Sequence, residues 1–206
     1  GLTEASPVVC CAALRVPGKP MSIGQPLPMT DVRLVDPDTR KVVGIGERGE
    51  LQVKGPQVML GYHNDADASA GAFDDGWLHT GDVAYMDEEG YFFIVDRIKD
   101  LIINGGFNVY PRVVEEAIVK HPAVEEVTVI GAPDERRGEV PIAFVKLRTG
   151  MPLTERELLD FLEPTLNKLQ MPREIIFKDS LPKTLIGKLS KKELREEYKA
   201  MKGKPS

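Results

Sequence analysis

The sequence predicts an α+β protein of two units: a β-rich first half, distorted and barrel-like or sandwich-like, and a second half in which helices flank a central sheet. Two observations predict this division. Short apolar runs between Gly- and Asp-rich turns fill the first 97 residues, and apolar residues at helical spacing appear only after Arg97. A chain of 206 residues is long enough for two units. We place the boundary to give residues 1–97 and 98–206.

In the first half, three short apolar segments read as strands, with turns between them. The expected strands are residues 32–35, 51–53 and 91–95. The expected turns are residues 36–38, 44–49 and 87–90.

In the second half, helix signals alternate with strand-like runs. Pro111 suits the first turn of a helix, and Val114, Ala117 and Ile118 follow at helical spacing. Capping boxes open two further helices, with Thr154 and Glu157 in the first and Ser190 and Glu193 in the second. The expected strands are residues 127–130, 142–147 and 174–177.

Composition and charge narrow the functional classes. The chain is 42% hydrophobic and carries a net charge of −5, but residues 178–204 hold nine Lys/Arg against four Asp/Glu. Such a basic segment attracts polyanions, or it is simply a solvated helix face. No run of 18 apolar residues is present, and Cys10 and Cys11 are adjacent, which excludes a CxxC site. We therefore expect a soluble, cytoplasmic protein.

Four segments are unusual for a purely structural protein. Thr3 and Glu4 place a hydroxyl beside a carboxylate, which suits Mg²⁺ and its phosphates. Asp82 follows Gly81, where a carboxylate can accept hydrogen bonds from two ribose hydroxyls. Residues 94–111 combine charges at the predicted boundary with a Gly-Gly pair that lets a ligand approach the backbone. Residues 181–189 present Lys188 after a glycine in a turn-rich loop.

Each of these segments also has an ordinary structural interpretation. The Gly81-Asp82 pair is typical of a turn, residues 94–111 of a linker that enters a helix, and Lys188 of a solvated surface charge. Their order and spacing are what favour a shared function.

Taken together, the ordered segments resemble the adenylate-forming (acyl-activating) enzyme superfamily, over essentially all 206 residues. Gly-Leu-Thr-Glu at residues 1–4 resembles its Gly-x-Thr-Glu motif. The later motifs match, in order, residues 49–55 with 61–62, 80–82, 96–100, and 182–184 with 187–188. GLTEASP and GFNVYP resemble the long-chain fatty-acid–CoA ligases in particular.

The resemblance implies a role for each matching residue. Glu4 would hold Mg²⁺, Thr3 would contact the phosphate or adenylate, and Asp82 would bind the ribose hydroxyls. Arg97 would assist at the ribose and phosphate, and Ile94 would pack on the nucleotide. These roles are typical of ATP-dependent acyl activation.

The second half would carry the remaining roles. Lys188 would be the lysine that catalyses adenylation, and Lys99 would be the hinge about which a small mobile C-terminal domain rotates. Gly106 would line the pantetheine tunnel of coenzyme A. The sequence departs from the family at Ile103 and Gln170, where relatives carry lysine. No role is therefore carried over to Ile103, and Gln170 in place of lysine can change the affinity for coenzyme A.

The resemblance implies that the chain is the C-terminal part of a fatty-acid–CoA ligase that uses ATP, Mg²⁺ and coenzyme A, and that residues 1–97 are the end of its large domain. On this view the 206 residues alone lack activity, because the family's phosphate loop and acyl pocket lie upstream of this region. We expect no nucleic-acid partner and at most peripheral membrane association, and leave a homodimer open. The alternatives are an aryl-CoA ligase, a peptide-synthetase adenylation domain, or a non-catalytic module that binds a nucleotide or partner.

Overall fold

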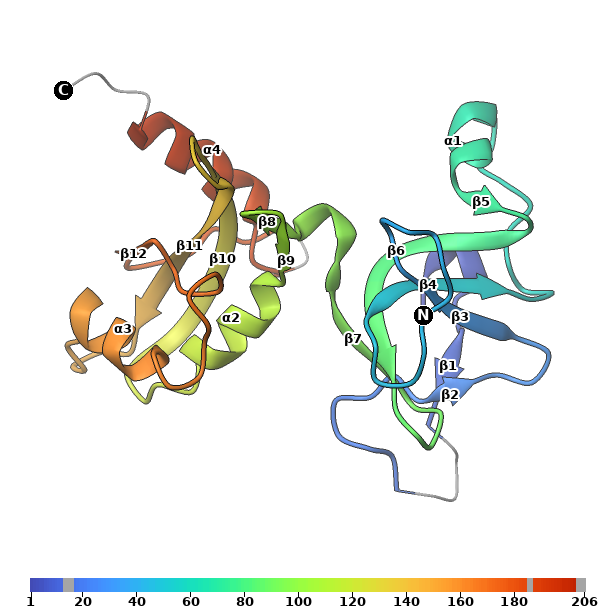
Figure 1. Ribbon diagram of the computed structural model, residues 1–206, viewed down its shortest axis with the longest axis horizontal. Helices are drawn as coiled ribbons and strands as arrows, with labels where there is room; N and C mark the ends of the chain where they lie inside the picture. Colours follow the sequence, from blue (N-terminus) through green and yellow to red (C-terminus); the bar gives the residue numbers. More distant parts are fainter. Residues whose placement is uncertain (13–16, 185–186, 203–206) are drawn as a thin grey trace. The chain divides into compact units, whose positions relative to one another are not determined.

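The computed structural model describes residues 1–12, 17–184 and 187–202, which form two compact units, Gly1–Lys99 and Asp100–Ser206 (Figure 1). The division falls two residues after the boundary expected from the sequence. None of the helices in the described ranges is long and apolar enough to cross a membrane.

The first unit is built almost entirely of antiparallel strands. Its strands are β1 (Cys10–Cys11), β2 (Gln25–Pro26), β3 (Asp31–Val35), β4 (Gly49–Lys54), β5 (Phe73–Asp74), β6 (Trp77–Met86) and β7 (Phe92–Arg97). A short helix α1 (Ala66–Gly71) and the 3-10 turn η1 (Thr3–Ala5) complete it, and the 3-10 turn η2 (Ile98–Asp100) spans the boundary to the second unit. The three expected strands are thus present as β3, β4 and β7.

The main sheet of this unit is open, which corrects the expected barrel-like form. Its order is β3-β4-β6-β5, and β7 also pairs with β6, while β1 and β2 form a separate two-stranded ribbon. Among the described residues no pairing joins β3 to β7, so the sheet does not close. Short strands between turns fit both forms, because closure depends on a pairing between strands distant in sequence.

The central strand β4 is buried on both faces, and its alternation separates two environments. Leu51 and Val53 lie in an apolar cluster with Val9, Leu34 and Phe92. Successive strand residues point to opposite faces, so the neighbouring polar residues of β4 face the other side. Two polar side chains are therefore buried in this strand, and both belong to the candidate site described below.

The second unit is a mixed sheet covered by helices on both faces. Its strands are β8 (Ile102–Asn104), β9 (Phe107–Val109), β10 (Val124–Asp134), β11 (Gly138–Leu147) and β12 (Glu174–Phe177), in the order β10-β11-β8-β9 with β12 parallel to β11. Its helices are α2 (Pro111–Ile118), α3 (Glu155–Leu162) and α4 (Lys191–Lys202). The expected sheet flanked by helices is observed.

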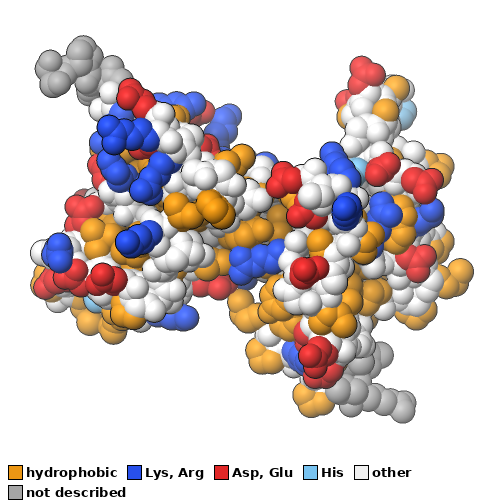
Figure 2. Space-filling model, viewed as in Figure 1, with side chains coloured by type: hydrophobic (Ala, Val, Ile, Leu, Met, Phe, Trp, Pro, Cys, Tyr) orange, Lys and Arg blue, Asp and Glu red, His pale blue; other side chains and the backbone are white. Residues whose placement is uncertain are grey.

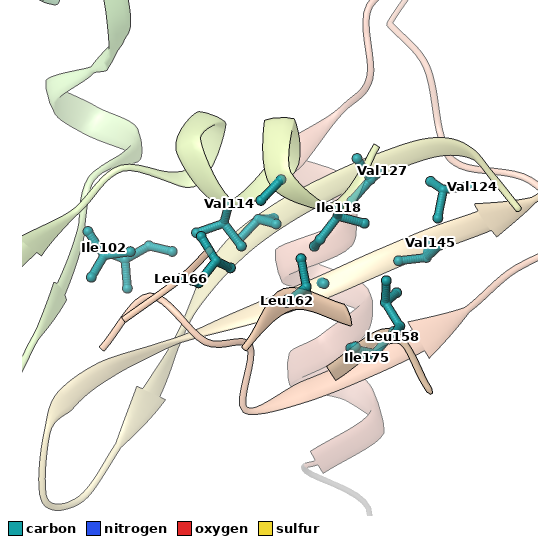
Figure 3. Close-up of a cluster of buried hydrophobic side chains, with 14 residues drawn as sticks. Ile102, Val114, Ile118, Val124, Val127, Val145, Leu158, Leu162, Leu166 and Ile175 are labelled. Carbon is teal, nitrogen blue, oxygen red and sulfur yellow. The ribbon is translucent and has the colours of Figure 1, made fainter. Parts of the chain in front are cut away.

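Alternation along β11 shows how both faces are filled. Ala143 and Val145 contribute to a cluster with α2 and α3, whose side chains meet over the sheet in Figure 3. Ile142 and Phe144 point the other way, toward Leu194 of α4. The period of two in the strand thus explains why helices lie on both sides.

The helix starts differ from expectation in one respect. Thr154 and Glu157 form the predicted capping box, with the Thr154 hydroxyl accepting from the Glu157 N–H and the Glu157 carboxylate accepting from the Thr154 N–H. At α4 only half of the second box is present, since the Glu193 N–H donates to Ser190 Oγ at 3.5 Å. The Ser190 N–H donates instead to the Pro182 carbonyl at 2.8 Å, so it needs no return bond from Glu193.

Carboxylates of two helices accept hydrogen bonds from backbone amides of two outer strands of this sheet. The Val129 N–H of β10 donates to Glu115 Oε1 of α2 at 2.8 Å. The Ile175 N–H of β12 donates to Glu155 Oε1 of α3 at 3.0 Å. Each carboxylate thus satisfies an amide that has no strand partner.

Candidate functional site

Strands β6 and β7 bring together two of the residues singled out in the sequence. Asp82 and Arg97 lie opposite each other in the ladder, and Arg97 Nε donates to Asp82 Oδ1 at 2.9 Å. The Asp82 side chain is one-quarter exposed and the Arg97 side chain about half exposed. The pair thus presents one carboxylate and one guanidinium to solvent from adjacent strands.

The backbone before Asp82 is held in an unusual conformation. Gly81 has a φ of +69°, which disfavours any residue with a side chain. The Asp82 N–H donates to Thr80 Oγ1 at 3.1 Å, and the Thr80 hydroxyl donates to the Leu51 carbonyl at 2.6 Å. The segment that carries Asp82 is therefore tied to the central strand β4.

A pocket of about 490 Å³ opens beside this segment, entirely within the first unit. Its lining combines polar groups of β4 and β6, small residues of α1 and the end of β7. The lining residues are Glu50, Tyr62, Ala68, Gly71, Ala72, His79, Thr80, Gly81, Arg97, Ile98 and Lys99. Arg97 lines the pocket and is hydrogen-bonded to Asp82, so Asp82 lies next to the pocket. Lys99, the last residue of the first unit, also lines the pocket and is exposed.

A buried polar network lies behind the pocket. Glu50 is 5% exposed and Gln52 is 1% exposed, on the face of β4 opposite the apolar cluster. His79 Nδ1 lies 2.8 Å from Glu50 Oε2, and the Gly81 N–H donates to Glu50 Oε1 at 3.2 Å. Arg33 Nε donates to Gln52 Oε1 at 2.8 Å. The network therefore runs from β3 through β4 to the segment that carries Asp82.

Glu4 is connected to the same pocket through Tyr62. The Tyr62 hydroxyl donates to Glu4 Oε1 at 3.0 Å, and this hydrogen bond to the carboxylate raises the pKa of Tyr62. Thr3, one residue earlier in η1, is exposed. Ile94 is half-buried and packs against the apolar cluster that contains Ala5. The structure thus places Ile94 at the margin of this cluster, with part of its side chain exposed.

In the second unit, Lys188 lies in a tight loop. Lys183 and Leu189 form a β-bridge, the Thr184 N–H donates to the Lys188 carbonyl at 2.7 Å, and Gly187 has a φ of +80°. Leu185 and Ile186, part of the segment singled out in the sequence, lie outside the described residues. Lys188 is exposed, and no hydrogen bond or ion pair of its ammonium is found within the part of the chain that the structure describes.

Lys183 of the same loop differs from Lys188. Its Nζ lies 2.5 Å from Glu126 Oε1 of β10, so its charge is already paired. The loop therefore offers one tethered ammonium and one that is available to a ligand.

Gly106 lies at the tip of the β8–β9 hairpin. Gly105 and Gly106 have φ values of +62° and +82° and form the two-residue turn between Asn104 and Phe107. A Cβ at Gly106 would meet no atom within 4 Å, so the position is exposed and only its backbone conformation demands glycine. Ile103 is likewise exposed in β8.

Two contacts tie this hairpin to the rest of the second unit, and one of them adjoins an arginine-rich pocket. The Gly105 N–H donates to the Arg137 carbonyl at 2.8 Å, and Asn104 Nδ2 donates to the Leu169 carbonyl at 2.7 Å, next to Gln170. The pocket, of about 470 Å³, is lined by Pro133, Asp134, Glu135, Arg136, Arg137 and Arg173. The pocket lining thus combines three arginines, which suit an anion such as a phosphate, with the carboxylates of Asp134 and Glu135.

Sequence analysis missed the residues that complete both sites: Glu50, His79, Tyr62, Arg136, Arg137 and Arg173. No local signal marked Glu50, because residues 50–53 alternate between polar and apolar as in an ordinary half-exposed strand. Arg173 is 36 residues from Arg137 in the sequence, so no local pattern could join them.

Comparison with known proteins finds similar sequences for both halves of the chain. The model of the AMP-binding enzyme family matches residues 1–63, and that of the AMP-binding enzyme C-terminal domain matches residues 113–188. The chain is 47% identical over 197 residues to a long-chain-fatty-acid–CoA ligase of Bacillus subtilis, covering 96% of this chain but 35% of that protein. It is 40% identical to luciferin 4-monooxygenase of Photinus pyralis, covering 98% of this chain and 37% of that protein.

A solved structure has the same fold over nearly the whole chain. The ATP-bound crystal structure of MatB from Rhodopseudomonas palustris matches 98% of this chain with a TM-score of 0.92 at 38% identity, over 40% of its own length. The chain therefore spans between a third and two-fifths of the length of these relatives.

Proposed function

Since this chain belongs to the family of AMP-binding, adenylate-forming enzymes, we propose that an enzyme containing it joins a long-chain fatty acid to coenzyme A at the expense of ATP. In the first half-reaction a carboxylate oxygen attacks the α-phosphorus of ATP, giving acyl-AMP and releasing pyrophosphate. In the second, the thiol sulfur of coenzyme A attacks the acyl carbon, and AMP leaves. The resemblance to the B. subtilis ligase supports the fatty acid as substrate.

The observation that carries this proposal is the Asp82–Arg97 pair beside the 490 Å³ pocket. The carboxylate of Asp82 accepts hydrogen bonds from the ribose hydroxyls, while the guanidinium of Arg97 contacts ribose and phosphate oxygens. Thr3 contacts the phosphate or adenylate, and Ile94 contributes apolar surface near the nucleotide. Nucleotide binding thus belongs to the first unit.

Magnesium fits Glu4 as part of a shared site. The described residues contain no group of three His, Cys, Asp or Glu that could hold a metal alone. Mg²⁺ is commonly bound through one or two carboxylates together with substrate phosphates, so a single carboxylate agrees with this mode. Tyr62 donates to one oxygen of Glu4, which orients the carboxylate. When bound, the ion would neutralise phosphate charge.

Lys188 supplies the positive charge for adenylation. Its unpaired ammonium stabilises the negative charge that develops as the carboxylate attacks the α-phosphorus. Because Lys188 belongs to the second unit and Asp82 to the first, we place the hinge at Lys99, which ends the first unit. Few residues absorb the rotation in a hinge of this kind. Residues 1–97 are then the end of the large domain, and residues 98–206 the mobile domain.

Coenzyme A is assigned to the second unit. Gly106 lines the path of the pantetheine arm, and the turn it forms adjoins the pocket of Arg136, Arg137 and Arg173. We assign the phosphates of coenzyme A to these guanidinium groups, which suit bidentate contacts to phosphate.

Pyrophosphate exchange tests this function. The intact enzyme that contains this chain is incubated with ATP, labelled pyrophosphate and, in turn, long-chain fatty, short-chain, aryl and amino acids. We expect exchange with the long-chain acids and thioester only after coenzyme A is added. Exchange with aryl or amino acids alone would assign another branch of the family, and no exchange with any acid would contradict the proposal.

A further inference from the structure

The strand that carries Asp82 bulges away from its neighbour. Gln52 pairs with His79 and Glu50 pairs with Val83, so three residues of β6, Thr80 to Asp82, oppose the single residue Leu51 of β4. Bulges of this kind redirect side chains and occur often beside active sites. The direction of the Asp82 carboxylate therefore depends on what holds the bulge in place.

A buried carboxylate fills the space behind this bulge. Glu50 accepts from the Gly81 N–H at 3.2 Å through Oε1, and its other oxygen lies 2.8 Å from His79 Nδ1 and 3.3 Å from Gln52 Nε2. The Glu50 side chain is 6% exposed. A carboxylate this deeply buried is costly unless several donors compensate for its lost hydration.

Two donors of this network follow directly from their contacts. Gln52 donates through Nε2, because its Oε1 already accepts from Arg33 Nε. The Gly81 amide can only donate. As a carboxylate, Glu50 therefore accepts from Gly81, from Gln52 and from the Nδ1–H of His79. Gln52 Nε2 also lies 3.1 Å from His79 Nδ1, which on this assignment is a contact between two donors. This assignment leaves the Nε2 of His79 as the ring nitrogen without a partner in the network.

We propose that Glu50, held by His79, is a positioning residue that fixes the Thr80–Asp82 bulge and so aims the Asp82 carboxylate at the ribose. This role rests on the proposed function, because it assumes that Asp82 binds a nucleotide. The bulge has a second support, the Thr80 hydroxyl, which donates to the Leu51 carbonyl and accepts from the Asp82 N–H. The two supports thus hold both the Gly81 and the Asp82 amide.

Glu50→Gln tests the role with little change in volume. The amide offers an NH₂ where the carboxylate has a second acceptor oxygen, so it faces one of the donors Gly81 N–H or His79 Nδ1–H. In the intact enzyme we expect KM for ATP to rise about tenfold, while KM for the fatty acid and for coenzyme A stays unchanged. A role confined to stability would leave all three values unchanged in the folded variant.

Glu47→Gln is the matched control. Glu47 also accepts a backbone N–H, that of Gly44 at 2.7 Å, but it lies exposed in a turn and does not line the pocket. We expect its KM for ATP to equal that of the unmutated enzyme. An equal rise in both variants would overturn the positioning role.

A gentler change covers the case in which Glu50→Gln does not fold. Thr80→Val replaces the hydroxyl with a methyl group, and we expect the same selective rise in KM for ATP. Thr80→Ser keeps the hydroxyl, so its KM for ATP should stay close to that of the unmutated enzyme. In the 206-residue chain, the ¹⁵N–¹H signal of Gly81 should shift in Glu50→Gln and exchange faster with solvent. An unshifted Gly81 signal would overturn the hydrogen bond on which the role depends.

The outcomes separate this inference from the proposed function. Normal pyrophosphate exchange with an unchanged KM for ATP in Glu50→Gln and in Thr80→Val overturns the positioning role alone. Absence of exchange in the unmutated enzyme overturns the proposed function and, with it, the ribose as the target of Asp82.

Discussion

Lys183 and Lys188 lie on the same loop, but within the described part of the chain only Lys183 forms an ion pair with a carboxylate of the second unit. Lys183 is paired with Glu126, whereas the Lys188 ammonium has no partner among the residues that the structure describes. An ammonium that must reach a phosphate gains nothing from a resident carboxylate, because that ion pair would first have to be broken. Lys188 is therefore the better candidate for catalysis.

We expect Lys188→Ala in the intact enzyme to lower the rate of acyl-AMP formation by about a hundredfold or more, since it removes the charge that stabilises the transition state. Thioester formation from supplied acyl-AMP and coenzyme A should continue. The two half-reactions are measured separately, by pyrophosphate exchange and by release of AMP. Lys183→Ala is the control, with both half-reactions retained, and an equal loss of both in Lys188→Ala would remove the role assigned to it.

At the level of whole elements, the start of α3 is the best defined local feature. Both halves of the Thr154–Glu157 capping box are present, and the Thr154 N–H and hydroxyl, which donate to the Glu157 carboxylate, lower the pKa of Glu157. A pKa lowered in the folded state adds stability above the unfolded value, and this stability is lost as the pH falls through the folded value.

Thr154→Ala should therefore destabilise the chain by about 1 kcal/mol at pH 7, because the first turn loses its cap. The difference from the unmutated chain should shrink as the pH falls through the lowered pKa of Glu157, because the protonated carboxyl no longer gains from the hydrogen bond of the Thr154 hydroxyl. Urea unfolding at pH 7 and pH 3 measures this. Thr165→Ala, at an exposed threonine beyond the end of α3, serves as control, and a difference independent of pH would contradict the assigned bond.

The same elements show what the sequence could and could not predict. Strands β3, β4, β7 and β12 and helices α2, α3 and α4 were predictable because their signals are local: alternation, capping residues and Pro111 at a helix start. The open sheet was not, since closure depends on pairing between distant strands. In the same way Asp82 was found from its motif, whereas its support Glu50 became visible only when β4 and β6 were paired.

At the scale of the whole molecule, the chain consists of two units that each have their own core. The first unit holds the apolar cluster around Leu51 and Phe92, and the second holds two clusters on opposite faces of its sheet. Lys and Arg side chains gather over α4 (Figure 2), where five of its twelve residues are basic. In the proposed function, nucleotide contacts belong to the first unit and coenzyme A contacts to the second.

We expect the 206 residues alone to form no acyl-AMP. They span 35% of the related B. subtilis ligase, and on the proposed function the phosphate loop and the acyl pocket belong to the part of the enzyme outside these residues. Incubation with ATP, Mg²⁺ and a long-chain acid, followed by chromatography for the adenylate, measures this. The intact enzyme is the positive control, and adenylate formed by the 206-residue chain would contradict the expectation.

The carboxylates of Glu115 in α2 and Glu155 in α3, which accept from amides of the outer strands, affect how the second unit can associate with other copies. An outer strand with open amides can recruit a strand from another molecule and begin fibril growth. Here an incoming strand would have to displace a charged acceptor from the Val129 or Ile175 amide. These two capped amides therefore make addition of a strand at either edge of the sheet less favourable.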